Sequence, residues 1–135
     1  MFLPKFNEDL AIDGYVKIPS GEYEGLLCKP SYLTLSQSEK EKICNGIGAA
    51  TGLSKHFPNT VWGLSIEECG NIHDYDYFIG GTKEDKDNAD LVLLHNSRLL
   101  IKRASFLLRY VRNLRVNKYY VAVQLGGNSH FNFIK

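Results

Sequence analysis

The chain has 135 residues, 44% of them hydrophobic and 23% charged, with a formal net charge of +1. This length suits a single domain spanning residues 1–135, and the composition excludes a disordered chain. The near-neutral total conceals two halves. Residues 1–90 hold fifteen acids against eight Lys and Arg, a net charge of −7, whereas residues 91–135 hold eight basic residues and no acid. This split excludes a uniformly basic nucleic-acid binder and an acidic tail protein.

The absence of apolar segments and the number of cysteines narrow the class of protein further. No stretch approaches 18 consecutive apolar residues, so we expect no transmembrane segment. The first residues, Met1-Phe2-Leu3-Pro4-Lys5, lack the basic and apolar regions of a secretory signal, which favours a cytoplasmic or virion-associated protein over a classically secreted one. The three cysteines, Cys28, Cys44 and Cys69, cannot all pair with one another, so disulfides do not build this fold.

The N-terminal third, residues 1–43, is expected to be irregular and extended, with one short helix. Ser36 followed by Glu39 predicts a capping box that begins this helix, which runs to about Lys42. Residues 44–52 then carry three glycines within seven positions. We expect a loop there, because glycine is a poor helix former and allows close approach of the backbone.

Two long antiparallel helices are predicted next. Ser65, followed by Glu67 and Glu68, is typical of a helix start, and Gly80-Gly81 predicts its end. Thr82, followed by Asp85, predicts a second start. Apolar residues at helical spacing extend the second helix to about residue 112, with a break near residues 104–105.

A third, shorter helix is predicted over residues 116–125 and ends at Gly126-Gly127. Trp62, with Phe57 and Val61, precedes the first long helix. Its expected role is core packing, and a rim for insertion into lipid is the alternative.

One face of the first long helix carries Ile66, Cys69, His73 and Tyr77 at spacings of three and four. If the chain reverses near residues 81–82, the position opposite His73 across the helix pair is Asp90. A carboxylate facing a histidine is the arrangement of a general base. Since the only nucleophile on this face is Cys69, one turn back, the pair points to activation of water. A partly buried histidine beside a surface acid is the alternative interpretation.

Asp74 is adjacent to His73 but points about 100° away from it around the helix. Its carboxylate offers one hard oxygen ligand, and the backbone carbonyls of the glycine-rich loop can supply others. The loop ends about 20 residues before the histidine and is therefore able to fold back to Asp74. The sequence thus predicts a calcium site beside His73.

These residues resemble the phospholipase A2 superfamily over roughly residues 44–95. The His-Asp-x-x-Tyr pattern is matched by residues 73–77, the Gly-x-Gly calcium loop by Gly46 and Gly48, and the aspartate of the second helix by Asp90. The likeness is greater to the compact, cysteine-poor bacterial and viral members than to the disulfide-rich type. It implies a mainly α fold with two long antiparallel helices, an upstream calcium loop and an irregular N-terminal region.

The resemblance also implies roles. His73 would activate water, Asp90 would orient His73, and Tyr77 would hydrogen-bond to Asp90. Asp74 would bind calcium, and the N–H of Gly46 would stabilise the oxyanion formed during hydrolysis of the sn-2 acyl ester of a glycerophospholipid. The remaining metal ligands would be the carbonyls of Cys44, Gly46 and Gly48. The sequence departs from the family pattern at Ala49, which replaces a glycine, and residues 1–40 match nothing in it. Whether Cys44 and Cys69 pair stays open.

A basic stripe follows on the second half of the chain, at Arg98, Lys102, Arg109 and Arg112. It is either a solvated face or a surface for anionic lipid head groups. No nucleic-acid partner is expected, because no known binding motif is present and the acidic half would repel phosphates. The alternative to an enzyme is a catalytically silent phospholipase A2-like fold that acts as a lipid-binding, structural or virion-associated module.

Overall fold

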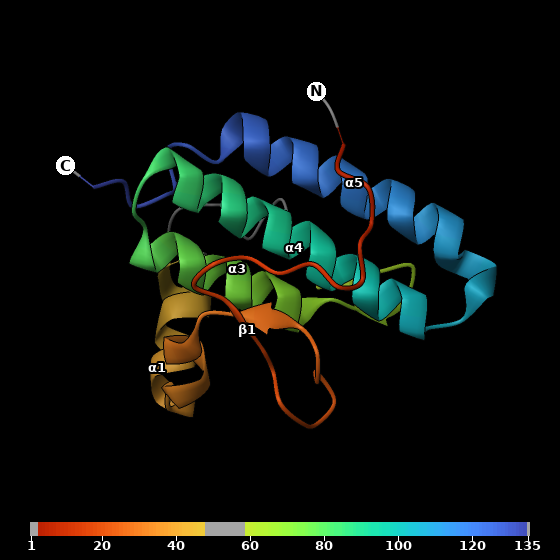
Figure 1. Ribbon diagram of the computed structural model, residues 1–135, viewed down its shortest axis with the longest axis horizontal. Helices are drawn as coiled ribbons and strands as arrows, with labels where there is room; N and C mark the ends of the chain where they lie inside the picture. Colours follow the sequence, from red (N-terminus) through yellow and green to blue (C-terminus); the bar gives the residue numbers. More distant parts are fainter. Residues whose placement is uncertain (1–2, 48–58, 135) are drawn as a thin grey trace.

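The structure, a computed structural model, describes residues 3–47 and 59–134. It is mainly helical, as predicted. Three long helices lie side by side, with α4 between α3 and α5 (Figure 1). Their bounds are Glu67–Ile79 for α3, Lys83–Arg103 for α4 and Arg109–Gly126 for α5.

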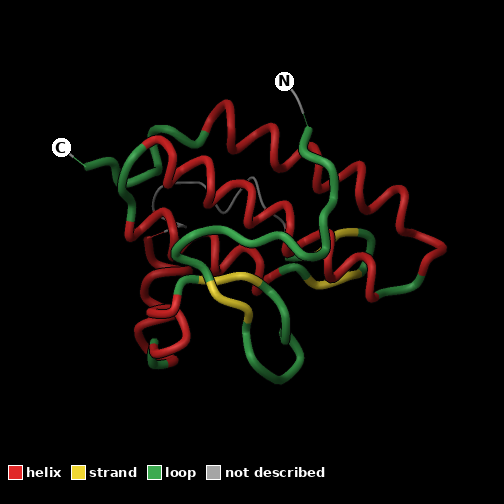
Figure 2. Tube along the Cα trace, viewed as in Figure 1, coloured by secondary structure: helices red, strands yellow, loops and turns green. Residues whose placement is uncertain are grey.

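Short elements surround these helices (Figure 2). Strands β1 and β2 form one antiparallel pair, and β3 and β4 form another. The bounds are Val16–Lys17 for β1, Leu27–Cys28 for β2, Thr60–Val61 for β3 and Leu64–Ser65 for β4. The helical segments are η1 at Pro30–Thr34, α1 at Gln37–Glu41, η2 at Lys42–Ile47 and η4 at Phe106–Leu108.

The core lies between the helices and under the N-terminal third. Helix α4 is buried on most of its circumference, since it packs against α3 on one side and α5 on the other. Asn96 of α4 is fully buried and binds the main chain of β2. Its Oδ1 accepts from Leu27 N at 2.8 Å and its Nδ2 donates to Leu27 O at 2.9 Å. The irregular N-terminal third is thus attached to α4 by a side chain that mimics a strand partner.

Most helix boundaries agree with the sequence, including the ends of α3 at Gly80 and of α5 at Gly126, but the starts of α3 and α5 do not. Thr82 caps α4 with the predicted capping box to Asp85, and α4 ends at the predicted break. The capping box predicted at Ser65 is absent, because Ser65 lies in β4 and the N-cap position is Ile66; Ser65 Oγ only accepts from Glu67 N at 3.5 Å. The prediction that the third helix begins at residue 116 is also wrong: α5 begins at Arg109 without a side-chain cap.

The described beginning of the glycine-rich stretch is helical rather than a loop. The Ser36–Glu39 capping box begins α1 as predicted, but the helix continues through η2, a π-helical segment. The loop prediction is therefore wrong for residues 44–47. Helical hydrogen bonding continues from α1 and overrides the weak propensity of a single glycine. Residues 48–58, which include Gly48 and Ala49, lie outside the described residues.

Trp62 is exposed rather than in the core. It sits in the β3–β4 turn with φ +47°, an uncommon backbone conformation for a bulky residue, and 54% of its surface is exposed. Its neighbour Val61 is buried as expected. None of the helices in the described part of the chain is both long and apolar enough to cross a membrane.

Candidate active site

The site lies in the α3–α4 hairpin, whose turn requires two glycines. Gly80 and Gly81 have φ values of +74° and +134°. A Cβ on Gly80 would lie 1.8 Å from the carbonyl oxygen of Asn132, so the C-terminal segment passes directly against this turn. Gly81 donates to Asn132 O at 3.0 Å and accepts from Ile134 N at 2.9 Å. The tail therefore fixes the reversal that brings the two helices face to face.

The predicted histidine–aspartate pair is present. His73 Nε2 lies 2.9 Å from Asp90 Oδ1 across the helix pair, and the side chains of both residues are inaccessible to solvent. Tyr77, one turn after His73, donates its hydroxyl to the same Oδ1 at 2.5 Å. The pairing deduced from the symmetry of the hairpin and the predicted Tyr77 contact are confirmed, while the catalytic roles of these residues stay predictions.

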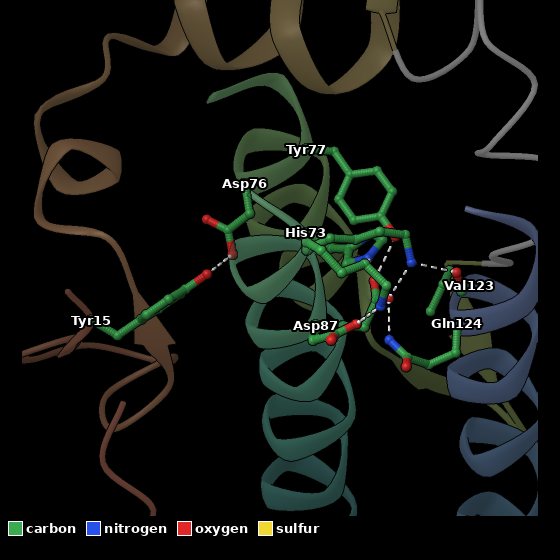
Figure 3. Close-up of polar contacts among 10 residues, drawn as sticks. Tyr15, His73, Asp76, Tyr77, Asp87, Val123 and Gln124 are labelled. Atoms are coloured by element: carbon green, nitrogen blue, oxygen red, sulfur yellow. Dashed lines mark hydrogen bonds and ion pairs between the residues drawn. The ribbon is translucent and has the colours of Figure 1, made fainter. Parts of the chain in front are cut away.

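Two further donors bind the other oxygen of Asp90, and sequence analysis missed both. Lys86 Nζ lies 2.8 Å from Asp90 Oδ2 and also donates to Val123 O at 3.0 Å, while Gln124 Nε2 lies 2.5 Å from Oδ2. Lys86 is fully buried. Figure 3 shows His73 and Tyr77 of α3 near Val123 and Gln124 of α5. The i,i+4 spacing of Lys86 and Asp90 is a visible sequence signal for one contact, but the α5 contacts depend on tertiary packing.

The electrostatics of Asp90 follow from these contacts. Burial alone would raise the pKa of Asp90, but hydrogen bonds from His73, Lys86 and Tyr77 outweigh it and hold the pKa below its usual value. Asp90 is therefore a carboxylate at neutral pH. Because the ammonium group of Lys86 is in direct contact, the carboxylate and the lysine together carry little net charge beside the histidine.

The thiol on the same face is not a nucleophile. Cys69 is fully buried, and burial raises the pKa of its thiol to about 12. It stays protonated at neutral pH and is unreactive. Cys28, Cys44 and Cys69 are all free, so no Cys44–Cys69 bridge is present. Cys69 therefore does not fit the role of a nucleophile beside His73, and activation of water by His73 and Asp90 stays a prediction.

Asp74 fits a role as a cation ligand. It is half-buried, and burial raises the pKa of its carboxyl to about 7. None of the hydrogen bonds or ion pairs among the described residues involves its carboxylate. A divalent cation would favour the ionised form that burial disfavours. No group of three or more His, Cys, Asp or Glu side chains in residues 3–47 and 59–134 is placed to hold a metal, so the other ligands would have to be carbonyls or water.

The segment predicted to provide those carbonyls lies beside α3. Cys44 in η2 donates its thiol to Asn71 O at 3.5 Å, one turn before Asp74. In a π-helical segment, however, each N–H is directed toward the carbonyl five residues earlier. The N–H of Gly46 is therefore directed along the helix, whereas the resemblance implies an N–H that points out of a loop toward the substrate. The predicted ligand Gly48 lies outside the described residues, so the full ligand set stays a prediction.

A second buried carboxyl on α3 points away from His73 and toward Tyr15 (Figure 3). Asp76 is fully buried and accepts a hydrogen bond from the hydroxyl of Tyr15 at 2.7 Å. Burial raises the pKa of Asp76 to about 7, although the Tyr15 hydrogen bond and Lys29 lower it in part. Sequence analysis did not identify this residue. Its contact attaches the N-terminal third to the helix that carries His73.

The four residues of the predicted basic stripe do not share one exposed face. Arg112 is buried and donates to the carbonyls of Val61 and Trp62, so its inclusion was wrong. Arg98 is half-buried and donates to Pro4 O at 2.8 Å. Lys102 and Arg109 are exposed, as expected. The stripe is interrupted because the β3–β4 turn packs on α5 and takes up the guanidinium of Arg112.

Comparisons of this chain with known proteins found no match. A scan of the sequence against models of protein families found no matching family, and searches of curated proteins and of solved structures found no similar protein.

Proposed function

We propose that this chain is a calcium-dependent hydrolase of the phospholipase A2 type, which cleaves the sn-2 acyl ester of glycerophospholipids. The observation that supports this most directly is the buried contact of His73 Nε2 with Asp90 Oδ1, to which Tyr77 also donates. Such a histidine is held in one orientation and one tautomer, with Nε2–H donating to the carboxylate. The other ring nitrogen, Nδ1, is then the atom that accepts the proton of an attacking water.

In the proposed reaction, Asp90 stabilises the imidazolium that forms when His73 takes this proton. Tyr77, Lys86 and Gln124 hold the carboxylate in place, so that it does not rotate away from the ring. Asp74 would hold calcium together with backbone carbonyls, among them those proposed for Cys44, Gly46 and Gly48. When bound, calcium would supply positive charge beside the ester carbonyl.

The test compares two buried histidines. His73→Ala should abolish the release of fatty acid from phospholipid vesicles. His95→Ala is the matched control, since His95 is also buried but stacks on Phe6 and does not contact Asp90. Its variant should retain activity if it folds, as measured by circular dichroism. Hydrolysis that survives His73→Ala and the removal of calcium with a chelator would refute the proposal.

The calcium site has its own readout. Asp74→Asn should abolish calcium binding measured by calorimetry, because the carboxylate is the only charged ligand proposed. The circular dichroism spectrum should not change, since the carboxylate of Asp74 makes no hydrogen bond among the described residues. Unchanged affinity for calcium would place the metal elsewhere.

One observation favours a catalytically silent module as the second candidate. The side chain of His73 is inaccessible to solvent, and Lys86 already neutralises Asp90. A substrate ester must reach the ring, and a neutralised carboxylate stabilises an imidazolium less well. In that case the polar cluster would serve to join the three helices, and wild-type protein would release no fatty acid under any calcium concentration.

A further inference from the structure

The turn between α4 and α5 exposes large apolar side chains that no other part of the described chain covers. Phe106 and Leu107 are 72% and 76% exposed, and Tyr110 is 75% exposed. We call these three residues, together with Arg103 and Arg109, the α4–α5 corner. In Figure 1 this corner forms one end of the molecule, away from α1 and from the C-terminus. Adjacent exposed aromatic and aliphatic side chains of this size mark interaction sites on soluble domains.

Basic residues flank the apolar side chains in the chain. Arg103 and Arg109 are exposed on either side of Phe106 and Leu107 in the chain, and no residue after position 90 is acidic. Lys102 is also exposed and pairs with Glu8. Apolar side chains flanked by cations are complementary to a membrane surface with anionic head groups. They are poorly complementary to a neutral apolar partner, which would leave the cations uncompensated.

A cavity beside the corner offers a place for a head group. Its volume is about 500 Å³, and its lining includes Lys5, Arg98, Lys102 and Arg109. Within residues 3–47 and 59–134, the hydrogen-bond partners of Arg98 are neutral, namely Pro4 O and Asn117 Oδ1. Arg109 donates to the carbonyl of Lys102 and forms no ion pair among the described residues. Cations that share a cavity in this way suit a phosphate group.

We propose that the α4–α5 corner binds the surface of an anionic lipid bilayer, with Phe106, Leu107 and Tyr110 entering the interface and the adjacent basic cavity receiving a lipid phosphate. Asp90 and Arg103 are thirteen positions apart on α4, so the corner lies about 20 Å from the dyad along the helix axis. Binding at the corner is separate from the proposed hydrolysis, and a catalytically silent chain would still bind.

The test uses His73→Ala protein in the presence of a calcium chelator, so that no lipid is consumed. Binding is measured by co-sedimentation with vesicles of phosphatidylcholine containing phosphatidylglycerol, and with vesicles of phosphatidylcholine alone. Trp62, the only tryptophan, is exposed in the β3–β4 turn that packs on α5, and its fluorescence gives a second readout. The expected result is binding to the anionic vesicles that weakens as salt is added.

Matched variants locate the surface. The double variant Phe106→Asp with Leu107→Asp should weaken vesicle binding by at least about tenfold, because two apolar side chains that would be buried in the bilayer are replaced by charged ones. Leu125→Asp is the control, since Leu125 is 71% exposed at the opposite end of α5. Arg109→Glu should also weaken binding, whereas Lys42→Glu, an equal charge reversal on an exposed residue of η2, should not.

Each other outcome overturns the proposal. If the corner and control variants lost equal amounts of vesicle binding, the binding would depend on overall charge and hydrophobicity and not on the α4–α5 corner. Displacement of the protein by millimolar inorganic phosphate would point to a soluble phosphate compound as the ligand. A loss of self-association in the corner variants, measured by analytical ultracentrifugation and without vesicle binding in the parent protein, would identify a second copy of the chain as the partner.

Discussion

Replacing Lys86 with methionine tests the electrostatic balance of the polar cluster. Lys86 is the only cation that the described residues bring into hydrogen-bond contact with Asp90, apart from His73 when protonated. Methionine fills a similar volume but leaves the carboxylate buried without its lysine, and Val123 O without a donor. Removing one member of a buried ion pair costs about 3–5 kcal/mol. We therefore expect the free energy of unfolding to fall by this amount, measured by urea titration with circular dichroism.

The double variant Lys86→Met with Asp90→Asn separates charge from packing. Neither charge of the pair remains in it, so it should be more stable than the single effects predict, with a coupling energy of about 2 kcal/mol or more. Lys83→Met provides the control. Lys83 and Asp87 form the same i,i+4 pair on α4, but both side chains are exposed. Losing that pair should change stability by less than about 0.5 kcal/mol.

Two results would refute this reasoning. If Lys86→Met changed the free energy of unfolding no more than Lys83→Met, burial of the ammonium group would have no energetic consequence. If the two single substitutions at Lys86 and Asp90 were additive, their contact would not be the reason for either loss.

Three more predictions follow from buried groups and from the hairpin turn. Burial raises the pKa of Asp76 to about 7, so the folded chain binds a proton at this carboxyl more tightly than the unfolded chain does. The free energy of unfolding should therefore fall as the pH rises from about 4 to about 7, by at most about 4 kcal/mol for three pKa units. Asp76→Asn should flatten this part of the curve of stability against pH. An unchanged curve would exclude Asp76 as its source. Gly80→Ala should lower the free energy of unfolding by more than about 2 kcal/mol in urea titrations, because the added Cβ would meet Asn132 O. Gly14 also has a positive φ, +87°, but faces open space, so Gly14→Ala should lower it by about 1 kcal/mol. Tyr77→Phe should lose about 1.5–3 kcal/mol of stability, because it removes a hydrogen bond to a buried carboxylate, and a neutral result would remove Tyr77 from the cluster.

The features that the sequence predicts correctly are local or follow from symmetry. Thr82 and Asp85 are three residues apart, and a capping box depends on nothing else. The pairing of His73 with Asp90 required only the position of the Gly80-Gly81 turn, because an antiparallel hairpin relates residues at equal distances from its turn.

The features that it fails to predict depend on contacts between distant segments. Helix α5 begins at Arg109, where no side chain caps it, because packing against α4 supplies the stability that a cap would otherwise provide. Arg112 is buried because the carbonyls of the β3–β4 turn, about 50 positions away, accept its hydrogen bonds. Gln124 reaches Asp90 from a third helix. None of these partners is visible in the local pattern.

The close fit of Gly127 against Tyr77 affects the order in which this site is completed during synthesis. A Cβ on Gly127 would lie 2.5 Å from the Tyr77 hydroxyl, and Phe131 packs edge-on against the same ring. Because Gly127 and Phe131 follow α3 and α4 in the chain, the ribosome releases the α3–α4 hairpin before the residues that enclose it. Gln124 follows Asp90 by 34 positions, a delay of about 2–7 s at ordinary elongation rates. Nascent chains stalled before Val123 should consequently leave α3 open to proteases, and the polar cluster becomes protected only once α5 has docked.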